Sequence, residues 1–158
     1  MFRDLLAKGK AITIEECISL LITEKRGVLS VIGDDGYPYG MPMNHFYNES
    51  ENTIYFHCGK SGHRIDALSK CSKASFCVYD SGKAIPGDWA LRVKSVIVFG
   101  RIEIIDDMQM ITDIMAKLSR KFTHDEEYIK REIEQYGYET ILLKLTPEHI
   151  SGKQITES

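Results

Sequence analysis

The residues best suited to binding an anion lie between positions 57 and 64. Lys60, Ser61, His63 and Arg64 follow a short β-type run, and a helical pattern begins in the same stretch. The first turn of a helix presents N–H groups without intrahelical partners and the positive end of the helix dipole. Cations and a hydroxyl around it favour a phosphate monoester. The sequence therefore predicts a phosphate site; alternatively, the two cations lie on a solvated helix face and Ser61 only caps the helix.

Two nucleotide-binding motifs can be excluded for this stretch. Gly59, Lys60 and Ser61 resemble the end of a P-loop, but the position five residues before Gly59 is Ile54 rather than glycine. Without a glycine-rich loop the chain cannot wrap a triphosphate. The pattern G-x-G-x-x-G is also absent, which argues against a dinucleotide site.

A second group of residues could receive the rest of a phosphorylated ligand. In the strand expected over residues 39–46, Gly40, Pro42 and Asn44 share one face, which is small and nearly flat. An aromatic ring could lie on this face, with Asn44 bonded to its polar edge. A ring and a phosphate suit FMN, with pyridoxal phosphate as a smaller competitor. The alternative is an edge strand that packs another strand, since Pro42 lacks a ladder N–H.

His57 could act either as a general acid or as a hydrogen-bonding group. It faces away from Ile54, Phe56 and Cys58 on its strand, which is consistent with a pocket-facing position. A general acid role is possible because histidine titrates near neutral pH. The simpler alternative is that His57 hydrogen-bonds a phosphate or the backbone.

The cysteines give no sign of a metal site. Their spacing contains no C-x-x-C pair, and His57, Cys58, His63 and Cys71 match no zinc-binding pattern. We expect reduced, mostly buried thiols in a reducing compartment. The four cysteines are Cys17, Cys58, Cys71 and Cys77.

Length and charge place the protein in a broad class. At 158 residues with 43% hydrophobic residues, we expect one domain, residues 1–158, with a single sizeable core. A net charge of −3 gives no general attraction to nucleic acid or to an anionic membrane. The sequence has no apolar run long enough for a membrane span and no signal peptide at its start, so a cytoplasmic location is expected.

The pattern of elements favours an antiparallel α+β fold. Thr13 and Glu16 form a capping-box signature, and Thr123 with Glu126 forms a second one. We interpret Gly27 as the end of the first helix. Strands follow one another and helices are grouped around them, which argues against a doubly wound sheet. Strands are expected in VLSVIG, YGMPMNHF, NTIYFHC, ASFCVYD, SVIVFGRIEII and YETILLKLT, with a hairpin turn at GDDGYP.

Five stretches together resemble the FMN-binding split-barrel superfamily, the pyridoxamine 5′-phosphate oxidase-like group. The resemblance covers residues 2–154 in the expected order and is greatest with nitroimidazole reductase-like (nitroimidazole-resistance) proteins. It rests on GYPYGMPMNHFY, IYFHCGKSGHRIDAL, ASFCVYD, SVIVFGRIEII and HISGKQ. It implies a mostly β, six-stranded antiparallel split β-barrel with peripheral helices, a homodimer that holds two FMN molecules between its subunits.

The resemblance also assigns site residues. Pro42, Met43 and Asn44 match the segment along the isoalloxazine ring. The segment that holds the ribityl phosphate matches His57, Lys60, Ser61, His63 and Arg64. The part usually contributed by the partner subunit matches Trp89, Lys94 and Ser95, although Trp89 could be only an interface anchor. His149 and Lys153 lie in the C-terminal segment that approaches the site.

The implied activity is a small FMN-dependent oxidoreductase that reduces a nitroaromatic or quinone-like molecule with a small-molecule electron donor. The chain ends in GKQITES, without the arginine-bearing C-terminal motif of pyridoxamine phosphate oxidases, which argues against vitamin B6 oxidation. Two alternatives stay open: a flavin-binding or sensing module without turnover, and a split barrel that holds haem or deazaflavin.

Overall fold

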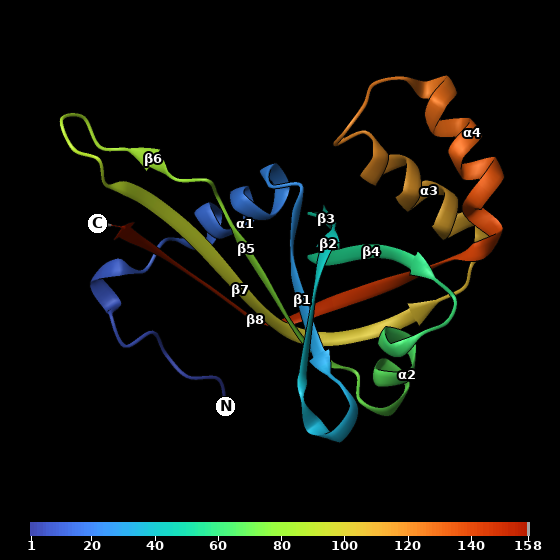
Figure 1. Ribbon diagram of the computed structural model, residues 1–158, viewed down its shortest axis with the longest axis horizontal. Helices are drawn as coiled ribbons and strands as arrows, with labels where there is room; N and C mark the ends of the chain where they lie inside the picture. The colour runs from blue at the N-terminus through green and yellow to red at the C-terminus, as the bar shows by residue number, and fades with distance from the viewer. Residues whose placement is uncertain (158) are drawn as a thin grey trace.

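The framework of the protein is one antiparallel sheet of eight strands, seen in a computed structural model that describes residues 1–157. Along the sheet the order is β2-β1-β5-β7-β8-β4-β3, and β6 pairs with β7 (Figure 1). The strands are β1 (Arg26–Ile32), β2 (Pro38–Asn44), β3 (Phe46–Asn48), β4 (Thr53–Gly59), β5 (Lys73–Tyr79), β6 (Lys83–Ala84), β7 (Leu91–Ile105) and β8 (Thr140–Glu157).

The sheet curls into a half-barrel around its core. Met41 on the edge strand β2 and Phe56 on β4, near the other edge, belong to one buried cluster. Leu21 of α1 and Leu68 of α2 fill the same cluster. The predicted antiparallel split barrel with peripheral helices is therefore confirmed. The edge position of β2 agrees with the interpretation of Pro42.

Four α-helices surround the sheet: α1 (Ile14–Thr23), α2 (His63–Lys70), α3 (Met108–Ser119) and α4 (Glu126–Tyr136). Short 3-10 turns occupy Lys8–Lys10, Asp34–Gly36 and Gly137–Glu139. In the described residues, no helix is both long and apolar enough to cross a membrane.

The helix caps agree only in part with the sequence. The capping box at Thr13 is confirmed, because its side chain accepts from Glu16 N and the Glu16 carboxylate accepts from Thr13 N. The second predicted box is wrong. Asp125 is the N-cap of α4 and accepts from Tyr128 N, while the Thr123 hydroxyl accepts from Asp125 N. A carboxylate nearer the helix takes the capping role.

The sheet has two more strands than the six that were expected. A break at His45 separates β3 from β2, and the short β6 pairs with the start of β7. The last strand is also longer than expected, since β8 continues through HISGKQ. The hairpin between β1 and β2 is confirmed, and Asp35 and Gly36 in its turn have φ of 55° and 78°.

A bulge interrupts the long pairing of β7 with β8. Phe99 lies opposite His149, but the next residue, Gly100, lies opposite Pro147, so one residue of β8 has no partner. Gly100 lacks a side chain because a Cβ there would clash with the Thr146 carbonyl oxygen. A second glycine is explained in the same way, and it corrects a prediction: Gly27 does not end α1 but lies in β1, against the Phe76 ring.

A second buried cluster joins α3 and α4 to the sheet. Tyr55 of β4 and Leu142 of β8 pack against Ile111 of α3 and against Ile129 and Ile133 of α4. Figure 1 shows these helices at one end of the molecule, beside β4. This cluster fixes the face of β4 that also carries His57.

His45 is fully buried where the chain leaves β2. Its Nε2 lies 2.7 Å from the Leu21 carbonyl oxygen, so this nitrogen carries the proton, and Nδ1 has no partner. Lys121 closes the same region by donating to the carbonyl oxygens of Glu24 at 2.7 Å and His45 at 2.9 Å. Burial, with a further contribution from the Lys121 charge, lowers the pKa of His45 to about 4.

This buried imidazole predicts acid sensitivity. The pKa of about 4 in the folded state lies below the 6.5 of an exposed histidine, so the unfolded chain binds more protons between these values. The free energy of unfolding should fall by about 3 kcal/mol as the pH drops from 6.5 to 4. Urea unfolding at several pH values measures this loss. His45→Gln, which keeps an N–H donor, should flatten the dependence, whereas His124→Gln at an exposed site should leave it unchanged.

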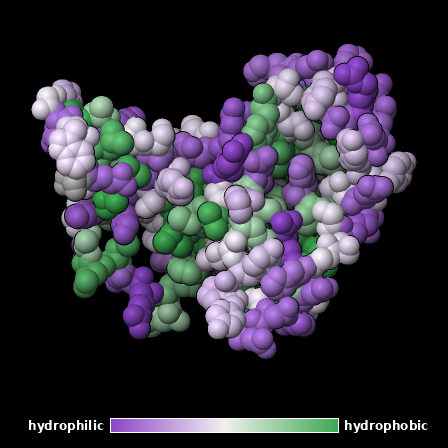
Figure 2. Space-filling model, viewed as in Figure 1, coloured by the Kyte–Doolittle hydropathy of each residue, from purple (hydrophilic) through white to green (hydrophobic). Residues whose placement is uncertain are grey.

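The side of the sheet away from the core, called here the outer face, carries exposed apolar side chains among small polar ones. Across one row, Pro42 lies opposite Val28, Val28 opposite Cys77, Cys77 opposite Ile97, and Ile97 opposite Ser151. Val28 is 36% exposed and Ile97 is 38% exposed. Figure 2 shows hydrophobic atoms in the centre and left of the view, while the α3–α4 end is mostly hydrophilic.

Candidate functional site

The flat face expected on β2 is present and open. Gly40 and Pro42 are exposed, and Asn44 is half-buried. A Cβ on Gly40 would lie 3.3 Å from both Ser30 Oγ and Val28 Cγ1, so this position is closely backed by β1. Because β2 is an edge strand, part of its backbone N–H and C=O groups have no partner strand. A planar ring could stack here and hydrogen-bond at its rim.

Met43 does not share that face. Its side chain is 7% exposed and lies in the core, together with Met41. Any contact between Met43 and a ligand on the flat face would therefore come from its backbone. Pro42 and Asn44 present their side chains to the open face.

The start of α2 is the least capped of the helix N-termini in residues 1–157. Its N-cap is Gly62, with φ of 111° and no side-chain hydrogen bond. Thr13, Asp107 and Asp125 cap the other three α-helices with side-chain oxygens. The helix begins later than Ser61, so Ser61 is not its cap. The first N–H groups of α2 can therefore donate hydrogen bonds to an external anion.

Two of the predicted phosphate residues lie at the surface before α2. The Lys60 ammonium is 2.9 Å from Asp106 Oδ1, and both side chains are largely exposed. Ser61 is exposed as well. An exposed ion pair of this kind is weak, so a phosphate could compete with Asp106 for Lys60.

His63 is turned towards the β1–β2 hairpin. Its ring stacks on Tyr39 at 4.2 Å between centroids, and its Nε2 lies 3.6 Å from Asp34 Oδ2. The backbone N of Asp34 also donates to His63 Nε2 at 3.4 Å. His63 thus joins α2 to the hairpin, and only a rotated ring would face a phosphate.

Arg64 joins the start of α2 to the core-facing side of β2. It is half-buried, and its Nε lies 2.9 Å from the Met41 Sδ on β2. Its guanidinium also interacts with the Cys58 thiol at the end of β4, where it opposes the effect of burial, which raises the pKa of this thiol. The start of α2 is therefore fixed against β2 across the open side of the half-barrel.

His57 lies beside this guanidinium but on the other face of β4. It shares that face with Tyr55, which packs on α3 and α4. Its Nδ1 is buried without a partner. Burial, followed by the Arg64 charge, holds the pKa of His57 below its usual value. The imidazole is therefore neutral at pH 7, which suits a hydrogen-bonding role better than that of a general acid.

Trp89, Lys94 and Ser95 lie apart from α2 within the single chain. Trp89 is 77% exposed just before β7, and Figure 1 shows this part of β7 at the end of the sheet away from α2. Lys94 and Ser95 are neighbours on a strand and point to opposite faces. The Lys94 ammonium is 2.7 Å from Glu16 Oε1 of α1, while Ser95 belongs to the outer face.

Lys153 and His149 lie on β8 and share the outer face. Lys153 is opposite Ser95, and His149 is opposite Phe99. Both are on the same side of the sheet as Gly40 and Pro42, several strands away. One chain thus brings residues 57–64 to the edge strand β2, and leaves Trp89, Lys94, Ser95 and Lys153 elsewhere.

The sequence did not reveal the partners that hold the site. Asp34, Asp106 and Tyr39 position two of the predicted residues, His63 and Lys60, yet each is distant in the chain from its partner. Only the turn signal at Asp34 hinted that this residue would lie at an end of the sheet. Contacts of this kind depend on the strand register.

The residues present fit a flat ring attached to a phosphate. The open β2 face lacks bulk, the uncapped start of α2 offers N–H groups, and Lys60 and Arg64 add two positive charges. The described residues include no group of three or more metal-ligating side chains of the kinds that could hold an ion. All four cysteines are free thiols.

This antiparallel half-barrel, with its edge strand and peripheral helices, has the split-barrel fold. The family model for pyridoxamine 5′-phosphate oxidase matches residues 13–154. The chain therefore belongs to the pyridoxamine 5′-phosphate oxidase family. None of the curated proteins compared with the chain matches it.

Solved structures show the same fold at low sequence identity. A candidate 5-nitroimidazole antibiotic resistance protein of Bacteroides thetaiotaomicron is 19% identical with a TM-score of 0.76, over 92% of this chain and 87% of that chain. A FAD-binding protein of Mesorhizobium loti is 21% identical with a TM-score of 0.66, over 92% and 97%. An F420 reductase is 16% identical with a TM-score of 0.59, over 84% and 93%.

Proposed function

We propose that this protein is an FMN-dependent oxidoreductase that reduces small nitroaromatic or quinone-like molecules in the cytoplasm. The observation that carries the proposal is the contact of Arg64 with Met41, which holds the uncapped start of α2 at the edge strand whose other face is the flat one. FMN needs both a ring surface and a phosphate site, as does the smaller pyridoxal phosphate. Bound FMN would supply the hydride or electron transfer.

The residues of the chain would hold the cofactor and orient it. Lys60 and Arg64 would neutralise the phosphate, together with the first N–H groups of α2. Ser61 would donate a hydroxyl hydrogen bond. Asn44 and the free backbone edge of β2 would bond the rim of the ring, and Pro42 would support its face.

A flavin titration followed by a turnover assay tests this proposal. The visible absorbance of purified protein is recorded before and after excess FMN and desalting, with FAD and F420 in parallel because relatives carry those names. Retained FMN supports the cofactor assignment. Steady-state oxidation of NADH or NADPH with a nitroaromatic or quinone acceptor then tests the activity.

The outcomes separate the alternatives. If the protein retains FMN but shows no turnover with any donor, it is a flavin-binding module and not an enzyme. Retention of F420 and not FMN would indicate a deazaflavin protein, and a Soret band would indicate haem. A protein that retains none of these would refute the flavin assignment.

We also propose that the working unit is a homodimer with the flavin between subunits. The outer face supports this, because Val28 and Ile97 expose apolar surface in one row and Phe99 adds to it. The start of β7 and the C-terminal end of β8 lie at the other end of the molecule from α2 within one chain (Figure 1). A second copy could bring them there.

Substitution on the outer face should dissociate the dimer. Sedimentation at micromolar concentration should give about twice the chain mass, and Ile97→Asp should give the mass of one chain because it places a charge in the apolar interface. Ile22→Asp is the matched control: Ile22, on α1, is 39% exposed and Ile97 is 38% exposed. A wild-type monomer that still retains FMN would contradict a shared cleft.

A further inference from the structure

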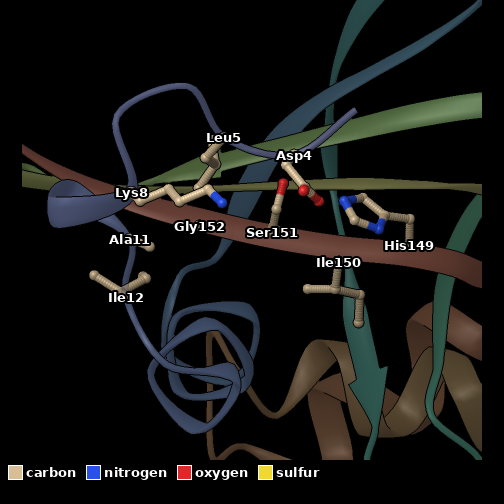
Figure 3. Close-up of a pocket in the computed structure, with 9 residues that line it drawn as sticks. All are labelled: Asp4, Leu5, Lys8, Ala11, Ile12, His149, Ile150, Ser151 and Gly152. Atoms are coloured by element: carbon tan, nitrogen blue, oxygen red, sulfur yellow. The ribbon is translucent and has the colours of Figure 1, made fainter. Parts of the chain in front are cut away.

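A hollow between α3 and α4 is lined by no residue assigned to the flavin or to the outer face. It has a volume of about 350 Å³ and is called here the helix groove. Figure 1 shows α3 and α4 side by side at one end of the molecule. The hollow drawn in Figure 3, between residues 4–12 and β8, lies on the outer face and belongs to the interface proposed above.

A small side chain opens the helix groove. Thr112, Ala116 and Arg120 lie on successive turns of α3 and form one wall. Because Ala116 carries only a methyl group, this wall is low at its middle. Ile129 and Ile133 of α4 are buried and form an apolar floor. The groove therefore offers hydrocarbon surface to a ligand.

An ion pair closes one end of the groove. Arg120 donates to the two carboxylate oxygens of Glu126 at 2.8 and 2.9 Å. At 1.5 Å per helical residue, the wall from Thr112 to Arg120 is about 12 Å long. A groove of this length and volume is narrow, so it suits an extended chain.

Lys130 stands beside the middle of the groove. The short connection over residues 120–125 makes α3 and α4 antiparallel, and at the far end Met108 lies against Gly137. Lys130 is therefore level with Ala116 of the opposite wall. An alanine at this level cannot pair with the ammonium group.

Within residues 1–157, the charge of Lys130 has no ion-pair partner. The acidic residue one turn before it, Glu126, is held by Arg120. Glu134 follows Lys130 by one turn, and this order of charges is the less favourable one for a helical pair. The Lys130 side chain is exposed and lines the groove, so its ammonium can donate to an anionic headgroup.

We infer that the helix groove binds an unbranched aliphatic carboxylate, whose chain lies over Ile129 and Ile133 and whose headgroup meets Lys130. The apolar floor and the narrow shape select the chain, and the unpaired cation selects the negative charge. The inference goes beyond the proposed function, because it uses none of the flavin residues and requires no turnover.

An NMR titration of the full chain with octanoate tests the inference. The methyl resonances of Ile129 and Ile133 should shift, and saturating FMN should leave the titration unchanged. Because the groove is open along one side, each CH₂ buries about half of its surface, so hexanoate should bind about fourfold more weakly than octanoate. Octylamine, which carries the opposite charge, should also bind more weakly.

The same titrations can overturn the inference. It fails if the two isoleucine methyl resonances stay unshifted at millimolar octanoate, or if octylamine binds as tightly as octanoate. Displacement of octanoate by FMN would also overturn it, because the ligand would then occupy the flavin site.

Variants on the two helices identify the site. Lys130→Ala should weaken octanoate binding about fivefold, the usual size of an exposed ion pair, whereas Arg131→Ala, which removes the next cation on α4, should not. Glu134→Gln should tighten binding because it removes a like charge near the headgroup. Ala116→Leu should fill the groove and abolish binding, and urea unfolding checks that this variant still folds. Equal affinities of Lys130→Ala and Arg131→Ala would refute the position of the headgroup.

Discussion

Replacing Lys60 and Arg64 together with alanine is expected to weaken FMN binding by about a hundredfold or more. Each cation would give the phosphate a charge-assisted hydrogen bond, and two such bonds at about 1.5 kcal/mol each account for that factor. Quenching of FMN fluorescence during a titration measures the affinity. Unchanged affinity in the double variant would refute the placement of the phosphate.

The controls for this experiment separate charge from fold. Lys70→Ala removes a cation from the last turn of the same helix, where Lys70 lies 3.4 Å from Asp34, and it should leave FMN affinity unchanged. Arg64→Lys keeps the charge but loses the guanidinium that contacts Met41. An affinity for Arg64→Lys between wild type and Arg64→Ala would show that both charge and position matter.

The largest effect on stability is expected for Gly100→Ala. A Cβ at this position would collide with the Thr146 carbonyl oxygen and lie 3.0 Å from Leu145 Cδ1, inside the longest strand pair. Because backbone must move to relieve the clash, the free energy of unfolding should fall by about 3 kcal/mol, the upper end of the usual range for overpacking. Urea unfolding measures the loss.

Gly59→Ala is the matched control for this substitution. Gly59 also lies in a strand, but a Cβ there would meet nothing within 4 Å. The free energy of unfolding of the Gly59→Ala variant should differ from that of the wild type by less than about 1 kcal/mol. Equal losses in the two variants would mean that the bulge is not tightly packed around Gly100.

Local signals in the sequence predicted much of the fold. The box at Thr13 and Glu16, the turn at Asp35 and Gly36 and the edge position of Pro42 depend on neighbouring residues, and each is found in the structure. The α2 start was also near its expected place. Short-range hydrogen bonding and backbone preference are sufficient for such features.

Features that depend on strand register could not be predicted. Gly27 looked like a helix end because the sequence does not show that the Phe76 ring crosses it. The break at His45 depends on the distant carbonyl of Leu21. Thr123 looked like a cap, yet Asp125 was closer to the helix. Local patterns therefore placed the elements but not their contacts.

In the candidate site, too, the sequence predicted the local segment but not its long-range contacts. The sequence named the residues from His57 to Arg64, and the structure brings this segment to the β2 edge. Their roles towards a flavin stay predictions. The tethers of Lys60 to Asp106 and of Arg64 to Met41 join segments far apart in the chain, and only a folded chain reveals them.

The position of β8 in the sheet has a consequence for biosynthesis. β8 is made last among the strands, yet it lies inside the sheet, between β7 and β4. Until residues 140–145 leave the ribosome, β4 can pair only with the short β3, and its other edge stays open. Such long-range pairing is slow to form. The nascent chain must therefore carry an unpaired strand edge, a target for chaperones, from the synthesis of β4 until that of β8.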